Sequence, residues 1–341
     1  MTSPTLVYRR YVTDRATLSL RLRVAFTLGA VILLHLLAGG LVLSGLMTGN
    51  QPLAFGVVLA AYAAGLKHSY DWDHISAIDN STRKFVAEGT NPASVGFAFS
   101  LGHSTIVTTA SIMVVAGAHF VSGAFEDGST ANHILGLVGA GISGFYLLFI
   151  GLFNGRISLE LLQGKQEGHS HGAAPGFMTS LMQRPLTRVR RPRDIFVLGL
   201  LFGLGFDTAT TIGLLLMTVA ASFAGVSALA LIGLPLAFTA AMTLCDTLNG
   251  LGMMKLYSSA LKKSLMKERF NLMVTTVSSV SALFISVITL GGFFHDLLGL
   301  QDPLTTWLAE LDLGNAGLVL VLVFLGIGIH FWRAGTTKSI L

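Results

Sequence analysis

Histidines and aspartates gather at four places in a sequence that is otherwise strongly apolar. The densest is the run from His68 to His74, which reads His-Ser-Tyr-Asp-Trp-Asp-His. One further histidine, His103, and two aspartates, Asp207 and Asp246, lie in three other apolar stretches. Imidazole and carboxylate groups without a cluster of thiolates suit a divalent ion such as Ni²⁺, Co²⁺ or Zn²⁺ better than Cu(I). The pattern therefore predicts a site for a divalent metal ion.

The composition places these residues in a membrane protein. Of the 341 residues, 52% are hydrophobic and only 11% are charged, which is not typical of a water-soluble chain. The 39 glycines suit closely packed transmembrane helices. Cys245 is the single cysteine, so an intrachain disulfide and a cysteine-based zinc or iron–sulfur site are excluded.

Eight apolar stretches are long enough to cross a bilayer, whose hydrocarbon core of about 30 Å requires roughly 20 helical residues. The predicted spans are 24–47, 53–79, 95–118, 133–153, 195–221, 226–254, 271–294 and 315–332. We therefore predict an all-α polytopic membrane protein that forms a single transmembrane domain over residues 1–341. Residues 154–194, rich in Gly, Arg and Pro, are expected to form a flexible cytoplasmic loop.

The basic residues predict the orientation of the chain. All but one of the 22 lysines and arginines precede the first span or follow spans two, four, six and eight. The positive-inside rule then places both termini in the cytoplasm, with the basic segments next to membrane lipid. The net charge of +5 thus reflects topology and does not indicate a nucleic-acid partner. The exception, Lys67, lies inside the second span.

The ionisable residues within the spans are expected to share one depth. A charged side chain at mid-bilayer costs about 2.5–3.5 kcal/mol, so such residues are functional candidates. Counting about 1.5 Å per residue from the predicted cytoplasmic ends places His68, His103, Asp207 and Asp246 roughly 12–18 Å deep. A bound dication would offset the buried carboxylate charges. We therefore predict one metal site near the midplane, formed by four helices.

The dense run allows two local structures. On a regular helix, His68, Asp71 and His74 lie within an arc of about 120°, whereas Asp73 points away. Asp73 then either pairs with another helix or the segment is locally unwound, as is common at transporter binding sites. The polar patches occur in spans two and three and again in spans five and six. This offset of three spans is the order expected of an inverted repeat.

These motifs resemble those of the nickel/cobalt transporter family (NiCoT), which are eight-helix permeases for Ni²⁺ and Co²⁺. The family's His-Ala-x-Asp-Ala-Asp-His-Ile motif corresponds to residues 68–75, and Ser-Leu-Gly-His-Ser-Thr to residues 100–105. Leu-Gly-Phe-Asp-Thr-Ala-Thr occurs at 204–210, and an Asp-Thr pair at 246–247. The resemblance implies uptake of Ni²⁺ or Co²⁺, as substrate and not as cofactor, across the cytoplasmic membrane. It assigns metal recognition to His68, Asp71, Asp73, His74, His103, Asp207 and Asp246.

Three positions depart from the family pattern. Thr211 replaces a glutamate, Asn249 replaces an aspartate, and Trp72 replaces an alanine. The first two departures remove negative charge, so a permease for another divalent ion such as Zn²⁺, Fe²⁺ or Mn²⁺ is an alternative. His35, in the first predicted span, is interpreted as a packed or hydrogen-bonded residue and not as a ligand.

The main alternative from another class is an intramembrane metalloenzyme. The His-Glu-x-x-His string of many zinc hydrolases does not occur in the sequence. No Gly-x-x-x-x-Gly-Lys-Ser/Thr string occurs either, so ATP hydrolysis by this chain is not expected. We therefore predict a permease and not an enzyme, and the chain itself indicates no ATPase subunit. Proton coupling is left open by the sequence.

Overall fold

The computed structural model describes residues 18–47, 51–115, 130–163, 191–204, 209–260, 264–311 and 316–337. Every regular element in these ranges is a helix. The helices are α2 (Leu20–Leu46), α3 (Gln51–His68), α4 (Trp72–Ala87), α5 (Val95–Val115), α7 (Thr130–Leu162), α9 (Pro192–Gly203), α10 (Ala209–Phe223), α11 (Ala228–Ala260), α12 (Ser264–Leu298), α13 (Pro303–Glu310) and α14 (Ala316–Thr337).

Five of the described helices are long and apolar enough to cross a membrane. These segments are Leu20–Gly45, Val95–Met113, Gly136–Leu162, Ala228–Ser258 and Leu272–Leu298. Three shorter helical segments are also apolar, namely Phe55–His68, Gly213–Phe223 and Gly317–His330. The prediction of an all-α, multi-pass membrane protein is therefore confirmed.

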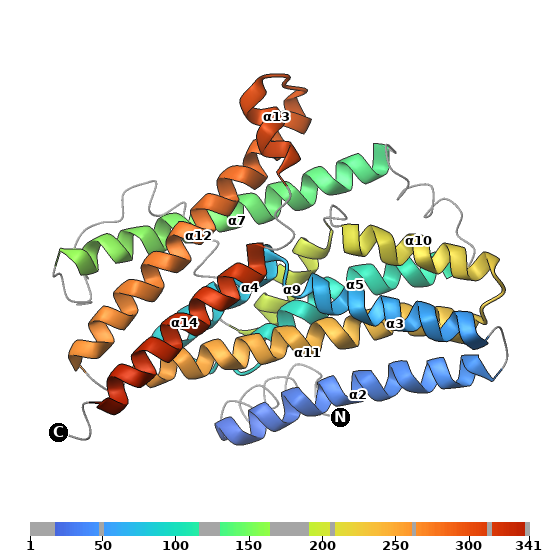
Figure 1. Ribbon diagram of the computed structural model, residues 1–341, viewed down its shortest axis with the longest axis horizontal. Helices are drawn as coiled ribbons and strands as arrows, with labels where there is room; N and C mark the ends of the chain where they lie inside the picture. Colours follow the sequence, from blue (N-terminus) through green and yellow to red (C-terminus); the bar gives the residue numbers. More distant parts are fainter. Residues whose placement is uncertain are drawn as a thin grey trace, which may run out of the picture.

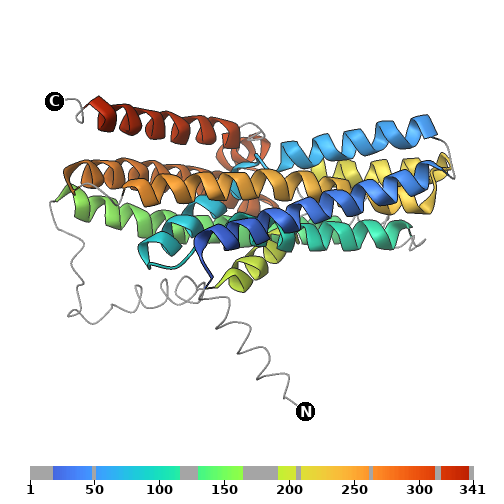
Figure 2. The same cartoon turned by 90° about the horizontal axis from the view of Figure 1, so that it is seen from below.

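The long helix α11 runs through the centre of the bundle and joins its two halves (Figure 1). Helices α2, α3, α5 and α10 lie beside one half of α11, and α12 and α14 lie beside the other, with α7 packed against α12. The second view shows α3 and α14 on the same side of α11, with their ends facing each other near the middle (Figure 2). The short helices α4 and α9 lie near this junction.

The predicted span 53–79 is wrong as one continuous helix, because α3 ends at His68 and α4 begins at Trp72. The N–H of Tyr70 donates to the carbonyl of Lys67 at 3.0 Å, and that of Asp71 donates to His68 at 3.0 Å. These bonds form a tight turn, and Asp71 is extended, with ψ of 140°. The alternative of a locally unwound segment is therefore the one that the structure adopts.

The predicted span 195–221 also differs from the structure. It corresponds to two helices, α9, which ends at Gly203, and α10, which begins at Ala209. At the end of the fourth span, α7 continues to Leu162, so the first residues of the predicted 154–194 loop are helical. Residues 164–190 of that loop lie outside the described residues, and its last three residues, 192–194, belong to α9.

The helix α13 was not predicted. Its N-cap is Asp302, whose carboxylate accepts hydrogen bonds from the backbone N–H groups of Leu304 at 3.1 Å and Thr305 at 3.0 Å. Pro303 occupies the first helical position, where its missing N–H has no helical partner to lose. In Figure 1, α13 projects from the end of α12.

Two glycines allow α5 to approach its neighbours closely. A Cβ atom on Gly96 would overlap the backbone carbonyl of Asp246, so α5 and α11 are in direct backbone contact there. A Cβ atom on Gly203 of α9 would lie 2.7 Å from the carbonyl oxygen of His103. Small residues allow such close packing between membrane helices. The contacts bring α5 close to α11 at one level and close to α9 two turns further along.

Candidate metal centre

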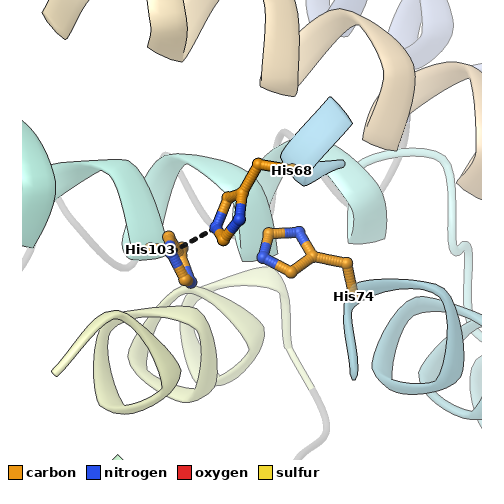
Figure 3. Close-up of side chains that lie close together, drawn as sticks. All are labelled: His68, His74 and His103. Carbon is orange, nitrogen blue, oxygen red and sulfur yellow. Dashed lines mark hydrogen bonds between the residues drawn. The ribbon is translucent and has the colours of Figure 1, made fainter. Parts of the chain in front are cut away.

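Three histidines from three helices meet at the junction of the two halves. His68 is the last residue of α3, His74 lies in the first turn of α4, and His103 lies in α5. One ligand atom from each lies within 4.8 Å of the other two. The exposed fractions are 0%, 0% and 3%, so the group is enclosed by protein. Figure 3 shows the three rings facing a common centre.

The turn between α3 and α4 brings two of the histidines together. It lets His68 and His74, six positions apart in the sequence, approach with ring centroids 4.7 Å apart. The ring of His103 lies 4.8 Å from that of His68 and 4.7 Å from that of His74. The three imidazoles therefore form a compact triangle.

Two carboxylates hold two of the imidazole rings. Nδ1 of His68 donates to Oδ2 of Asp71 at 2.8 Å. Nδ1 of His74 donates to Oδ2 of Asp246 at 3.0 Å, and Asp246 is fully buried on α11. A carboxylate that accepts the Nδ1 proton leaves the lone pair on Nε2, as in histidine ligands of many metal sites. Asp71 and Asp246 thus orient imidazoles, and neither belongs to the three-residue group itself.

The separation of two of the three Nε2 atoms is compatible with a shared ion. Those of His68 and His103 are 2.9 Å apart (Figure 3). Two nitrogens bound at about 2.0–2.1 Å and at a right angle would lie about 2.9 Å apart. Nε2 of His74 is buried and has no hydrogen-bond partner among the described residues. The site can therefore present imidazole nitrogens to one divalent ion.

Two other predicted residues are placed differently. Asp73 is partly buried, and its Oδ1 accepts the backbone N–H of His74 at 2.9 Å. Its negative charge lies in the first turn of α4, where the helix dipole favours it. Asp73 is not part of the three-histidine group. Asp207 lies outside the described residues, so its position is not compared.

The departures from the family pattern lie outside the three-histidine group. Trp72 packs against an apolar cluster of α7 and α12 that includes Leu147 and Ile285. Asn249 lines a groove between α11 and α14, and Thr211 is buried on α10.

His35 is hydrogen-bonded elsewhere, as the sequence analysis expected. Its Nδ1 lies 2.9 Å from the carbonyl oxygen of Val31. Its Nε2 lies 3.1 Å from the hydroxyl of Tyr62.

Aromatic rings enclose the histidines. The ring of Phe238 lies 5.5 Å from that of His68, and the ring of Phe99 lies 5.0 Å from that of His74. Such a surrounding excludes water, which strengthens the interaction between an ion and its ligands. One buried carboxylate, Asp79, was not among the predicted site residues, because the second span was expected to end there. Asp79 is only 1% exposed.

Comparison with known proteins identifies the family of this chain. The family model of the high-affinity nickel-transport protein (NicO) matches residues 54–331. The chain belongs to this family. It is 37% identical to the nickel transporter NicT of Mycobacterium tuberculosis, over 86% of this chain and 83% of NicT. It is 36% identical to the high-affinity nickel-transport protein NixA of Helicobacter pylori strain J99, over 91% of this chain and 96% of NixA.

The family includes a relative named for another metal. The chain is 32% identical to the cobalt transport protein NhlF of Rhodococcus rhodochrous, over 84% of both chains. No solved structure gives a significant match. The resemblance to nickel/cobalt permeases is therefore confirmed, and so is the prediction of a transporter in place of an enzyme. In this family the metal ion is the transported substrate and not a cofactor.

Proposed function

We propose that this protein imports Ni²⁺ or Co²⁺ across the cytoplasmic membrane through the three-histidine site. The observation that carries the proposal is the enclosed triangle of His68, His74 and His103, with ligand atoms within 4.8 Å of one another. The names of the relatives support the choice of metal, since they include both nickel and cobalt transporters. A membrane potential of about 100 mV would favour entry of a dication by roughly 4.6 kcal/mol.

Each residue has a chemical role in this proposal. The Nε2 atoms of the three histidines bind the ion. Asp71 and Asp246 keep His68 and His74 in the tautomer that exposes these atoms, and their charges offset the dication. Asp73 adds negative charge nearby without direct contact, and Asp207 remains a predicted participant from its family motif.

The proposed topology has eight crossings. The pairs α3 with α4 and α9 with α10 each count as one crossing, and α2, α5, α7, α11, α12 and α14 as one each. Both termini then lie in the cytoplasm, as the basic residues indicate. Each half of the proposed inverted repeat would contain one crossing made of two helices. This supports a metal site at the repeat interface.

The site must open to one side at a time for transport. His68, His74 and His103 are at most 3% exposed, so an ion held there is shut off from water on both sides. The proposal therefore includes a movement of helices around the site.

The test is uptake of ⁶³Ni²⁺ and ⁵⁷Co²⁺ into liposomes that contain the purified protein. We expect uptake by the intact chain and its loss in His68→Ala and His74→Ala, because each removes a ligand. His35→Ala is the matched control, since His35 is hydrogen-bonded to Tyr62 and lies outside the site.

Two outcomes would contradict the proposal. Full uptake by both site variants would reject the site. Uptake of neither metal by the intact protein, with transport of Zn²⁺, Fe²⁺ or Mn²⁺ instead, would reject the choice of substrate.

A further inference from the structure

A buried carboxylate outside the metal site joins three helices. Asp79 of α4 accepts a hydrogen bond from the hydroxyl of Tyr257 on α11 at one oxygen, Oδ1. Its other oxygen, Oδ2, accepts the hydroxyl of Ser278 on α12 at 2.6 Å. All three residues are at most 5% exposed. We call these residues the Asp79 cluster.

A second polar contact joins α4 to α12 one turn away. Nη1 of Arg83, four residues after Asp79, donates to the hydroxyl of Thr275 at 2.9 Å. Thr275 precedes Ser278 by three residues on α12, whereas Arg83 follows Asp79 by four on α4. The two contacts therefore lie on one face of each helix, and the two helices run in opposite directions there. The face of α4 that contains Asp79 is thus fixed against α12.

The Asp79 cluster also gives α4 a second attachment to α11. The first attachment is the bond from His74 to Asp246, which belongs to the metal site. The second is the bond from Tyr257 to Asp79, about 7.5 Å further along α4. One attachment lets a helix pivot about it, whereas two separated attachments fix both its rotation and its position.

Helix α4 requires such attachments because it is not continuous with α3. The turn at residues 69–71 separates the two helices, so the placement of α3 in the membrane does not determine that of α4. His74 lies in the first turn of α4, and any rotation of this helix would move its ring. His68 and His103, on α3 and α5, would be left in place.

We propose that Asp79, held by Tyr257 and Ser278, is a positioning residue for metal transport. It keeps α4 in the rotation that brings His74 to the ion shared with His68 and His103. This inference rests on the proposed metal site and adds three residues that do not contact the ion. Groups that orient metal ligands affect metal affinity by about 10–100-fold when removed.

The test compares metal binding by Tyr257→Phe, Asp79→Asn and Ser278→Ala in the full-length protein, purified in detergent. We expect the Kd for Ni²⁺ to rise about tenfold in Tyr257→Phe and Asp79→Asn, and less in Ser278→Ala. The KM for uptake should rise with the Kd, while the rate at saturating Ni²⁺ stays within about twofold. The visible absorption of bound Co²⁺ should also change, because it reports the geometry of the ligands.

Two matched controls remove the same groups elsewhere. Ser279→Ala removes a buried hydroxyl next to Ser278 that donates to the carbonyl of Gly151 at 2.8 Å. Tyr62→Phe removes a tyrosine hydroxyl on α3 that lies 3.1 Å from Nε2 of His35 and has no hydrogen bond to α4 among the described residues. Both controls should bind Ni²⁺ like the intact protein, within about twofold.

The outcomes separate this inference from the proposed function. An unchanged Kd and Co²⁺ spectrum in all three variants, beside normal binding by the intact protein, would overturn the inference alone. An equal loss in the controls would also overturn it, since it would show general loosening of the bundle. Should Asp79→Asn fail to fold, Tyr257→Phe and Ser278→Ala decide the question. Failure of the intact protein to bind Ni²⁺ or Co²⁺ would instead reject the metal site itself.

Discussion

Apolar residues pack on both sides of the histidine triangle, and the α4 side adds a buried carboxylate that is held by hydrogen bonds. On the side of α3 and α10, an apolar cluster fills the space between the helices. Its buried members are Ala61, Val107, Leu214, Ala221, Val226, Ala230, Leu231, Leu234, Phe238 and Met242. On the side of α4 and α12, the Asp79 cluster places directional hydrogen bonds among buried residues.

The difference indicates that the two sides affect different properties, metal affinity on one side and stability on the other. Apolar contacts have no preferred direction, so the α3 side can exclude water without fixing any ring precisely in place. Hydrogen bonds to a buried carboxylate are directional, and leaving one unmade costs about 1–3 kcal/mol or more. We therefore expect changes on the α4 side to alter metal affinity, and changes on the α3 side to alter stability.

The largest effect on affinity is expected for Asp246→Asn. The amide cannot serve as the same anionic acceptor for Nδ1 of His74, and a negative charge beside the dication is lost. The Kd for Ni²⁺ should rise about 100-fold, at the upper end for groups that orient metal ligands. Isothermal titration calorimetry of the purified variant measures this. Asn249→Ala, on the same helix but facing the groove beside α14, is the matched control and should bind normally.

A smaller effect is expected from Asp71→Asn, and a smaller one still from Asp73→Asn. Asp71 is bonded to the ring of His68, whereas among the described residues Asp73 is bonded to the backbone of His74 alone. The Kd for Ni²⁺ should rise about tenfold in the first variant and about threefold or less in the second. Binding of ⁶³Ni²⁺ at equilibrium compares the two. The reverse order would mean that Asp73 touches the ion.

The smallest effect on affinity is expected for Leu214→Ala on the α3 side. Leu214 is fully buried in the apolar cluster. Loss of its packing should reduce the free energy of unfolding by about 2–5 kcal/mol through the cavity that remains. The Kd for Ni²⁺ should stay within about threefold. Unfolding by SDS in bicelles measures the first quantity, and a large change in the second would remove the distinction between the two sides.

Much of the site could be predicted from the sequence. Histidines and aspartates in apolar stretches are costly unless they act together, which predicted one site that includes His68, His103, Asp207 and Asp246. The structure brings His68, His103 and Asp246 together with His74, and Asp207 lies outside the described residues. Their separate roles could not be predicted, because whether a carboxylate faces an ion or an imidazole depends on the local turn. The sequence did not decide whether the helix is interrupted after His68. Hydrophobicity over a long apolar stretch does not reveal a turn of only three residues.

Other features depend on contacts between distant parts of the chain. The hydrogen bond between Tyr257 and Asp79 joins residues 178 positions apart. Neither residue type indicates which distant residue will be its partner. The helix α13 was predictable in principle, because an aspartate followed by proline is a common helix start. The eight residues of α13 are too few to cross a bilayer, so a prediction based on long apolar stretches does not include this helix.

X-ray absorption spectroscopy of the purified protein loaded with Ni²⁺ tests whether the three histidines bind one ion. We expect imidazole nitrogens at about 2.0–2.1 Å from the metal and the multiple scattering typical of histidine rings. The imidazole signal should fall in His103→Ala, which leaves α3 and α4 unchanged. A spectrum with oxygen ligands only, or one that is identical in His103→Ala, would contradict the claim that the three histidines share one metal ion.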